Sequence, residues 1–407
     1  MHANGAEPHK DRRMTALAGL TVLDFSRFLP GAYFGWLAGD MGAEVIRIEH
    51  PRELAKAQAM FGSGADEQAE RLRRARPTYT RNKRSLLLNP GHPAAAPVLR
   101  ALVERADVLV EDYRPGVMAA MGLGYADLAA INPRLIYASV SFTGQTGPLA
   151  GRAGHDPAAL ALAGALSRLN GTPEPTLPGA QVADVLAGAH ASIAVLTALQ
   201  FRNASGTGQH VDVAMTDAAM PLLMVALGRA QDPAEIGFPT GDWHPKGGVW
   251  RCADGEWLCT TDMEPRYWAR FCEAVERPDY AARQFDLAAH PAMHDDLAAL
   301  FASRDRAHWL TLLEAADTQV MPVLTPGQAL RHPHAEARGM HVTLPVGDEA
   351  AVEQVGTPFH LSACPPVQHR PAPLPGADNA AIFAELGFDA EALEAAGVFS
   401  SQQGASR

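Results

Sequence analysis

The sequence predicts an α/β protein with a large domain built around a parallel sheet and a smaller α+β domain. Short apolar strands alternate with helices through the first part of the chain, the pattern of a parallel sheet that helices cover on both faces. The character changes after Gly241, where a hairpin and then helices follow. The chain has 407 residues, and single hydrophobic cores stop growing at roughly 250 to 300 residues, so we place the large domain at residues 15–225 and the small one at 240–330.

The first elements form a βαβ unit. Residues 20–26 (LTVLDFS) read as a short strand, residues 31–42 (GAYFGWLAGDMG) as a helix of small residues, and residues 43–50 (AEVIRIEH) as a second strand. A polar segment, residues 80–90 (TRNKRSLLLNP), separates this unit from the next. The alternation then continues with a helix at 92–106, a strand at 107–112, a helix at 125–132 and a strand at 135–142.

The middle of the chain is mainly helical. Helical patterns run from about residue 156 to 230 and are broken by polar connections at 170–181 and 203–217. The apolar run at 185–201 contains His190 and falls short of the ~20 apolar residues that a membrane span needs, so we expect a buried helix there.

The last third begins with a predicted hairpin at residues 247–262, whose turn is Ala253-Asp254-Gly255. Three helical patterns follow, from Glu264 to about Ala316. The Pro-rich residues 356–379 are expected to be extended and to lead into a final helix at 379–387, so the tail can return to the large domain.

Composition narrows the function classes. The formal net charge of −11 and the absence of a Lys/Arg cluster argue against a nucleic-acid or anionic-membrane surface and favour a small-molecule ligand. The four cysteines form no CxxC pattern, which fits free thiols in a reducing cytoplasm. Residues 1–19 contain no apolar core of a signal or anchor, so we expect a frayed extension and a cytoplasmic protein.

Several short catalytic motifs are absent. The sequence has no GxGxxG after its first strand, no GxxxxGK[ST], no HExxH and no GxSxG. A nicotinamide dehydrogenase, a P-loop NTPase, a zinc protease and an α/β-hydrolase therefore lose their main sequence support.

The remaining motifs carry a family resemblance. In this order, the chain contains FSRFLPGAYFGWLAGDMGAEVIRIEHP, RNKRSLLLN, ADVLVEDYRPGV, AGHD, TGQHVDVAMTDA and FAELGF. Together they resemble the family III CoA-transferase superfamily, closest to its α-methylacyl-CoA racemase branch, over about residues 20 to 398. The resemblance implies a large Rossmann-like domain made from both chain ends, with residues 340–407 returning to it, and an interlocked homodimer.

The resemblance also implies the chemistry. His155, before the Asp of GHD, matches the racemase histidine, Asp184 matches the carboxylate of both branches, and Glu264, beside Pro265, matches an acidic residue that begins a helix of the small domain. The implied activity is racemisation of a 2-methylacyl-CoA by proton exchange at the α-carbon. The alternative is a CoA-transferase in which Asp184 attacks the thioester, and a third possibility is a CoA-binding protein without turnover.

The residue types suit this chemistry. Epimerisation next to a thioester removes a weakly acidic proton from one face and returns one to the other, so a histidine and a carboxylate on either side are suitable groups. A helix beginning near Asp156 supplies backbone N–H groups for the enolate, and Asp156 can cap that helix or orient His155. From spacing alone, His155 is more often a structural histidine and Asp184 an N-cap.

Coenzyme A arrives as part of the acyl-CoA substrate, and we expect no permanently bound cofactor, no metal, and neither a nucleic-acid nor a membrane partner. Its phosphates need cations near the carboxyl edge of the sheet, where open α/β sheets bind ligands. Arg114 of the RPGV element follows a predicted strand, and Lys83, Arg84 and Arg47 are further candidates. Arg114 can instead pair with Glu111 or Asp112, and the segment around Lys83 can be an ordinary solvated turn.

Overall fold

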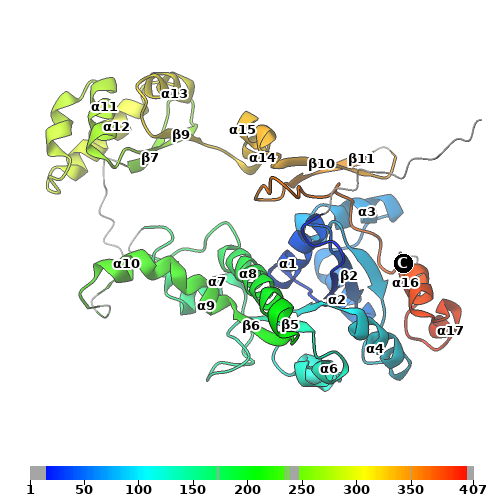
Figure 1. Cartoon of the computed structure of the whole chain (residues 1–407). Helices are drawn as coiled ribbons and strands as arrows, with labels where there is room; N and C mark the ends of the chain where they lie inside the picture. Colours follow the sequence, from blue (N-terminus) through cyan, green and yellow to red (C-terminus); the bar gives the residue numbers. More distant parts are fainter. Residues whose placement is uncertain are drawn as a thin grey trace, which may run out of the picture. The chain divides into compact units, whose positions relative to one another are not determined.

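The computed structural model describes residues 15–171, 174–232, 234, 236–237, 247–348 and 350–400, which form two compact units (Figure 1). The first unit contains the described residues within Met1–Asn170, Glu174–Gly237 and Gly339–Arg407. The second contains those within Phe238–Arg338, together with Gly171. Residues 1–14 of the expected N-terminal extension lie outside the described residues.

A six-stranded sheet in the order β3-β2-β1-β4-β5-β6 forms the centre of the first unit, and every neighbouring pair is parallel. The strands are β1 (Thr21–Asp24), β2 (Glu44–Glu49), β3 (Arg84–Leu87), β4 (Val108–Glu111), β5 (Ile136–Ser141) and β6 (Gln209–Ala214). The predicted parallel sheet is confirmed. The strand order reverses between β1 and β4, and in doubly wound sheets ligands bind at the carboxyl ends of the strands at such a point.

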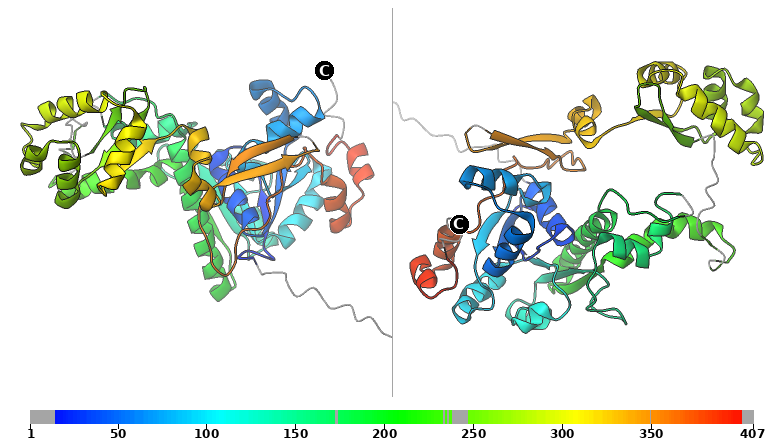
Figure 2. Two further views of the ribbon diagram at one scale, coloured as in Figure 1. Left: turned by 90° about the horizontal axis from the view of Figure 1, so that it is seen from above. Right: turned by 180° about the vertical axis from the view of Figure 1, so that it is seen from behind.

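Helices cover both faces of this sheet because successive strand residues point to opposite sides. Val22 packs on one face and Leu23 on the other, each in its own core. The first core includes residues of α1 (Leu29–Asp40), α7 (Asp156–Leu162), α8 (Val182–Ser205) and α9 (Met215–Ala219). The second includes residues of α4 (Ala96–Arg105), α6 (Tyr125–Ile131) and α16 (Asn379–Leu386). Figure 2 shows the green and the red helices on opposite sides of the blue and cyan sheet.

Smaller elements complete the first unit. The antiparallel hairpin of β10 and β11 packs against α3, and α17 lies beside α16. These elements and the remaining helices are α2 (Pro51–Phe61), α3 (Glu67–Ala75), α5 (Val117–Ala120), α10 (Met224–Arg229), β10 (His341–Val346), β11 (Ala350–Val355) and α17 (Ala390–Ala395).

The second unit has its own core. Its three-stranded antiparallel sheet has the order β7-β8-β9, and large aromatic side chains such as Trp250, Trp268 and Phe301 are buried between sheet and helices. Its elements are β7 (Gly247–Arg251), β8 (Trp257–Thr261), α11 (Pro265–Ala274), α12 (His290–Phe301), α13 (Arg306–Ala315), β9 (Val320–Val323), α14 (Pro326–Leu330) and α15 (Pro333–Ala337). The predicted hairpin and the three helices after it are confirmed.

Two strands of the main sheet were missed by the sequence analysis. β3 lies inside the segment that we read as polar, because three basic or amide residues precede its four residues. β6 lies inside a predicted polar connection, because a Gly/Ser/Thr-rich stretch leads into it and polar residues alternate with its valines. Their pairing with β2 and β5 overrides this local composition.

The expected burial of residues 185–201 is correct for one side of α8 only. Ala187, Ala191 and Val195 are completely buried against the sheet, whereas Ile193 and Phe201 are 62% and 55% exposed. Among the described residues α8 is the one helix long and apolar enough to cross a membrane by length and composition, and 44% of that apolar stretch is buried.

The C-terminal segment is joined to the first strands by a buried ion pair. Arg81 donates to both carboxylate oxygens of Asp40, at 3.0 and 2.6 Å, and both side chains are inaccessible to solvent. Thr357 donates to the same carboxylate at 2.8 Å, and Nδ1 of His369 lies 3.4 Å from it. The predicted return of the extended tail therefore has specific partners in the first 100 residues.

Candidate active site

A cavity of about 540 Å³ opens in the first unit at the point where the strand order reverses. Segments that follow the carboxyl ends of neighbouring strands line it: residues 27–30 follow β1, 112–115 follow β4 and 142–144 follow β5. His155 and Asp184 also line it, from the starts of α7 and α8. The cavity therefore lies where an open α/β sheet is expected to bind its ligand.

His155 is the residue directly before α7. Its extended backbone makes it the N-cap, although its side chain caps no amide. A Cβ on Gly154 would come within 2.4 Å of the Phe142 ring, so the glycine permits the close approach that places His155 on the cavity wall. The imidazole is solvent-exposed and lies edge-on to the Phe28 ring, with centroids 6.1 Å apart.

Asp156 connects the two helices. Its buried carboxylate accepts a hydrogen bond at 3.0 Å from the backbone N–H of Asp184, one of the first amides of α8, which have no partner within that helix. We expected Asp156 to cap its own helix or to orient His155. The structure shows that it instead caps α8 and fixes the start of that helix beside α7.

Asp184 is the third residue of α8, and Gln181 is the N-cap, so the alternative interpretation of Asp184 as an N-cap is wrong. Burial raises the pKa of Asp184 to about 6, the Asp156 carboxylate adds to the rise, and His155 opposes it. A carboxyl group with such a pKa exchanges protons readily near neutral pH. The structure thus brings His155 and Asp184 to one cavity.

Three arginines line the same cavity, Arg27, Arg114 and Arg152. Arg114 was predicted from its place after a strand. Arg27 and Arg152 were missed, although Arg27 also follows a strand, β1, so the rule that selected Arg114 would have found it.

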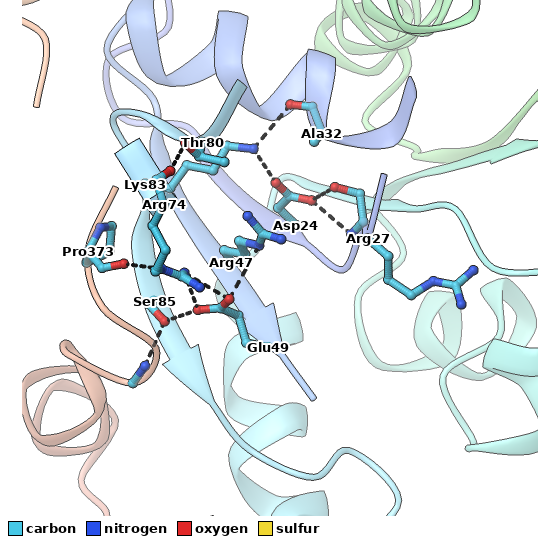
Figure 3. Close-up of polar contacts among 12 residues, drawn as sticks. Asp24, Arg27, Ala32, Arg47, Glu49, Arg74, Thr80, Lys83, Ser85 and Pro373 are labelled. Carbon is cyan, nitrogen blue, oxygen red and sulfur yellow. Dashed lines mark hydrogen bonds and ion pairs between the residues drawn. The ribbon is translucent and has the colours of Figure 1, made fainter. Parts of the chain in front are cut away.

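Lys83 and Arg84 do not line the cavity. Lys83 is buried and donates to Asp24 at 2.6 Å and to the carbonyl of Ala32 at 3.1 Å (Figure 3). Arg84 begins β3 and pairs with Glu44 and Glu385, at 2.6 and 2.8 Å. Both are therefore engaged in ion pairs of the sheet, and their expected contact with coenzyme A stays a prediction.

Arg47 has fewer contacts within the protein. In Figure 3 it lies between Asp24 and Glu49, and its Nε is 3.8 Å from Glu49, too far for a hydrogen bond. Burial alone would lower the pKa of Arg47, but Glu49, Asp24 and Asp112 outweigh it and raise the pKa. Glu49 itself accepts from both Arg74 and Ser85. Arg47 therefore stays charged, and its side chain donates no hydrogen bond within the described part of the chain.

Glu264 belongs to the second unit, where it is the N-cap residue of α11 and precedes Pro265 as predicted. Its carboxylate accepts a hydrogen bond from the Gln319 side chain at 3.3 Å. The backbone N–H of Gln319 donates to Asp262, a fully buried carboxyl whose pKa burial raises to about 6. Asp262 directly follows β8 and thereby connects the end of that strand to the segment before β9.

Comparison with known proteins shows what this arrangement is similar to. The model of the family described as CoA-transferase family III matches residues 17–379. α-Methylacyl-CoA racemase from Homo sapiens is 32% identical over 386 residues, which cover 93% of this chain and 95% of the relative. Succinate–glutarate CoA-transferase from Agrobacterium fabrum is 30% identical and covers 92% of this chain and 96% of the relative. A crystal structure of a CaiB/BaiF family protein from Brucella suis has a TM-score of 0.79 at 28% identity, covering 91% of this chain and 99% of that one.

Proposed function

Since this chain belongs to CoA-transferase family III, we propose that it is an acyl-CoA racemase that exchanges the α-proton of a 2-methylacyl-CoA thioester. The family's enzymes include both racemases and CoA-transferases at similar identity to this chain. The observation that carries the proposal is the presence of His155 and Asp184 in one cavity, because racemisation needs two proton-transfer groups where CoA transfer needs one carboxylate.

In the proposed reaction one of the two groups removes the α-proton and the other returns a proton to the opposite face. The electron pair of the broken C–H bond moves into the thioester carbonyl, so an enolate oxygen carries the negative charge between the two transfers. The amino end of α8, a helix of 24 residues, provides a positive dipole beside Asp184 that favours this charge.

We propose that coenzyme A enters as part of the substrate and that the enzyme needs no resident cofactor. Arg114 lines the cavity and Arg47 has donors available nearby in the sheet, so both suit the phosphates of the substrate. A homodimer, and assistance to His155 by Glu264, remain predictions from the family resemblance.

The experiment that tests the proposal follows the α-hydrogen in deuterated water. The protein is incubated with 2-methylacyl-CoA thioesters of one configuration, without an acceptor acid, and deuterium and configuration are read by mass spectrometry and NMR. We expect exchange with loss of configuration, and at least a hundredfold loss of exchange in His155→Ala. His190→Gln, a histidine outside the cavity lining, is the matched control and should retain exchange. Full exchange in His155→Ala would exclude the two-base assignment.

The second candidate is a CoA-transferase, favoured by relatives such as the succinate–glutarate enzyme and by the access of Asp184 to the cavity. Asp184 would attack the acyl carbon and release the CoA thiolate, which then attacks the aspartyl carbonyl and frees the carboxylic acid. A second acid reverses these steps and leaves as the new thioester. Hydroxylamine trapping of Asp184 with no α-proton exchange would establish this reaction and exclude the racemase.

A further inference from the structure

Arg27 occupies a special place in the cavity. It is the third residue after β1 and lines the cavity wall, and its side chain is 28% exposed. In Figure 3 this side chain points away from the buried Lys83–Asp24 pair. Arg27 is therefore a cavity residue that lies outside the Lys83–Asp24 pair, and its own ion-pair partners are Asp112 and Glu53.

The guanidinium of Arg27 is held in one orientation. Its Nε donates to Oδ1 of Asp112 at 3.3 Å and its Nη2 to the backbone carbonyl of Asp112 at 3.0 Å. The ring of Tyr113 stacks against it, with the guanidinium carbon 4.1 Å from the ring centre. A planar group fixed on two edges and one face loses little conformational entropy when a ligand binds its remaining edge.

That remaining edge has donors to spare. Among the described residues Nη1 makes no hydrogen bond, and its ion-pair neighbour, Glu53, is 3.8 Å away and already accepts from Lys56 at 2.7 Å. The Asp112 carboxylate is also shared, because it accepts from the backbone N–H groups of Arg27 and Phe28, at 3.0 and 2.8 Å. Part of the charge of Arg27 is thus left for a ligand.

The position of Arg27 relates it to the reacting carbon. Its guanidinium carbon is 5.3 Å from the centre of the Phe28 ring, and that ring is 6.1 Å from the imidazole of His155. Arg27 therefore lies no farther from His155 than the sum of these two distances, a span that a short acyl chain bridges. Between them the half-exposed Phe28 presents an apolar surface.

We propose that Arg27 determines specificity by binding a carboxylate at the far end of the acyl group, so that the preferred substrates are mono-CoA thioesters of short 2-methyl dicarboxylic acids. Phe28 contacts the methylene chain, and the free edge of Arg27 receives the carboxylate through charge-assisted hydrogen bonds. The inference rests on the proposed function, since it takes His155 as the reaction centre. A phosphate of coenzyme A is the other anion that Arg27 could meet.

The test compares 2-methylglutaryl-CoA with the derivative in which the free carboxylate at C5 is a methyl ester. This ester has the same carbon chain without the negative charge. Deuterium exchange gives kcat/KM, and titration calorimetry gives the dissociation constant of each thioester, which reports recognition whether or not exchange occurs. The wild type should prefer the free acid about tenfold by both measures. Arg27→Gln should lose that preference because its kcat/KM and affinity fall for the acid and stay unchanged for the ester. Arg27→Lys should keep part of the preference.

The controls distinguish binding of the acyl carboxylate from binding of a coenzyme A phosphate. Arg152→Gln removes a second arginine of the cavity and should leave the preference unchanged. If Arg27→Gln weakened binding and exchange of the acid and the ester equally, Arg27 would bind coenzyme A and the proposal would be overturned. The proposal would also be overturned if the wild type showed no preference for the acid, or if it bound neither thioester. Selective binding of the acid without exchange would overturn the racemase assignment and keep Arg27 as the recognition residue. Melting temperatures confirm that each variant is folded.

Discussion

Asp40 and Asp184 are carboxylates of the same unit, yet their surroundings drive their pKa values in opposite directions. Burial would raise the pKa of Asp40, but the hydrogen bonds and charges of His369 and Arg81 hold it well below its usual range. Burial and the neighbouring Asp156 carboxylate raise the pKa of Asp184 to about 6, and among the described residues no arginine or lysine is bonded to its carboxylate to offset them. The comparison teaches that a paired cation, more than the depth of burial, decides whether a carboxylate here stabilises the fold or stays available for proton transfer.

The largest expected effect comes from removing the unpaired carboxylate. Asp184→Asn keeps the shape of the side chain and should lower the rate of α-proton exchange by roughly a hundredfold to ten-thousandfold, since it removes a proton-transfer group. Its melting temperature should change little because the group makes no buried ion pair. Asp40→Asn should instead lower the melting temperature and leave the rate of exchange nearly unchanged. Unfolding of Asp184→Asn would contradict this difference between the two carboxylates.

Removing the cation of the paired carboxylate is the next largest change. Arg81→Met leaves Asp40 buried without its main partner, so the free energy of unfolding should fall by about 3–5 kcal/mol in urea titrations. Arg71→Met, which breaks an exposed pair with Glu67 on α3, is the matched control and should cost about 1 kcal/mol or less. Similar losses in both variants would contradict the importance of burial.

Glu111 sharpens the comparison through pH. Burial raises the pKa of this carboxyl group, which is 4% exposed, to about 7. The folded state therefore keeps a proton that the unfolded state releases near pH 4.5, so stability falls as pH rises from there to about 7, by roughly 1.4 kcal/mol per pH unit. Glu111→Gln should flatten this decline in unfolding experiments across that range. Asp40 should contribute to the pH dependence with the opposite sign, because its pKa is lowered in the folded state. Its contribution to the free energy of unfolding is lost as pH falls below about 4. Parallel curves for wild type and Glu111→Gln would show that Glu111 is ionised at neutral pH.

The smallest effect concerns the pH dependence of catalysis. When Asp184 acts as the base it must be ionised, so kcat/KM for that direction of exchange should fall about tenfold per pH unit below about pH 6. Measuring initial exchange rates from each configuration of the thioester separates the two directions. A flat profile from pH 5 to 7 in both directions would mean that the pKa of Asp184 lies outside this pH range.

Much of the first unit could be predicted because its local patterns agree with the tertiary structure. The strands β1, β2, β4 and β5 are short segments rich in Val, Ile and Leu, most of whose residues are buried, as a sheet covered on both faces requires. β3 and β6 depend on a neighbouring strand for their conformation, and no local pattern reveals that neighbour. The strand order, and with it the place where it reverses, also follows from long-range pairing.

The candidate site shows the same limit. The family motifs identified His155, Asp184 and Arg114, which the structure brings to one cavity. Lys83 could not be separated from them by sequence, because its partner Asp24 lies 59 positions away and appears beside it only after folding. Arg27 was available to the rule that found Arg114, and its fixed orientation needed the positions of Asp112 and Tyr113.

The pairing of Asp40 and Arg81 with Thr357 and His369 has a consequence for biosynthesis. Thr357 and His369, which complete this cluster, are synthesised some 300 positions after Asp40. At ordinary translation speeds this delay is on the order of tens of seconds. Until then the Asp40–Arg81 pair of the nascent chain lacks its contacts with Thr357 and His369. Helix α4 likewise lacks its neighbour α16. Premature termination before α16 would therefore leave an apolar face of the sheet open to chaperones and proteases, even though every residue of the candidate active site in this unit had already been made.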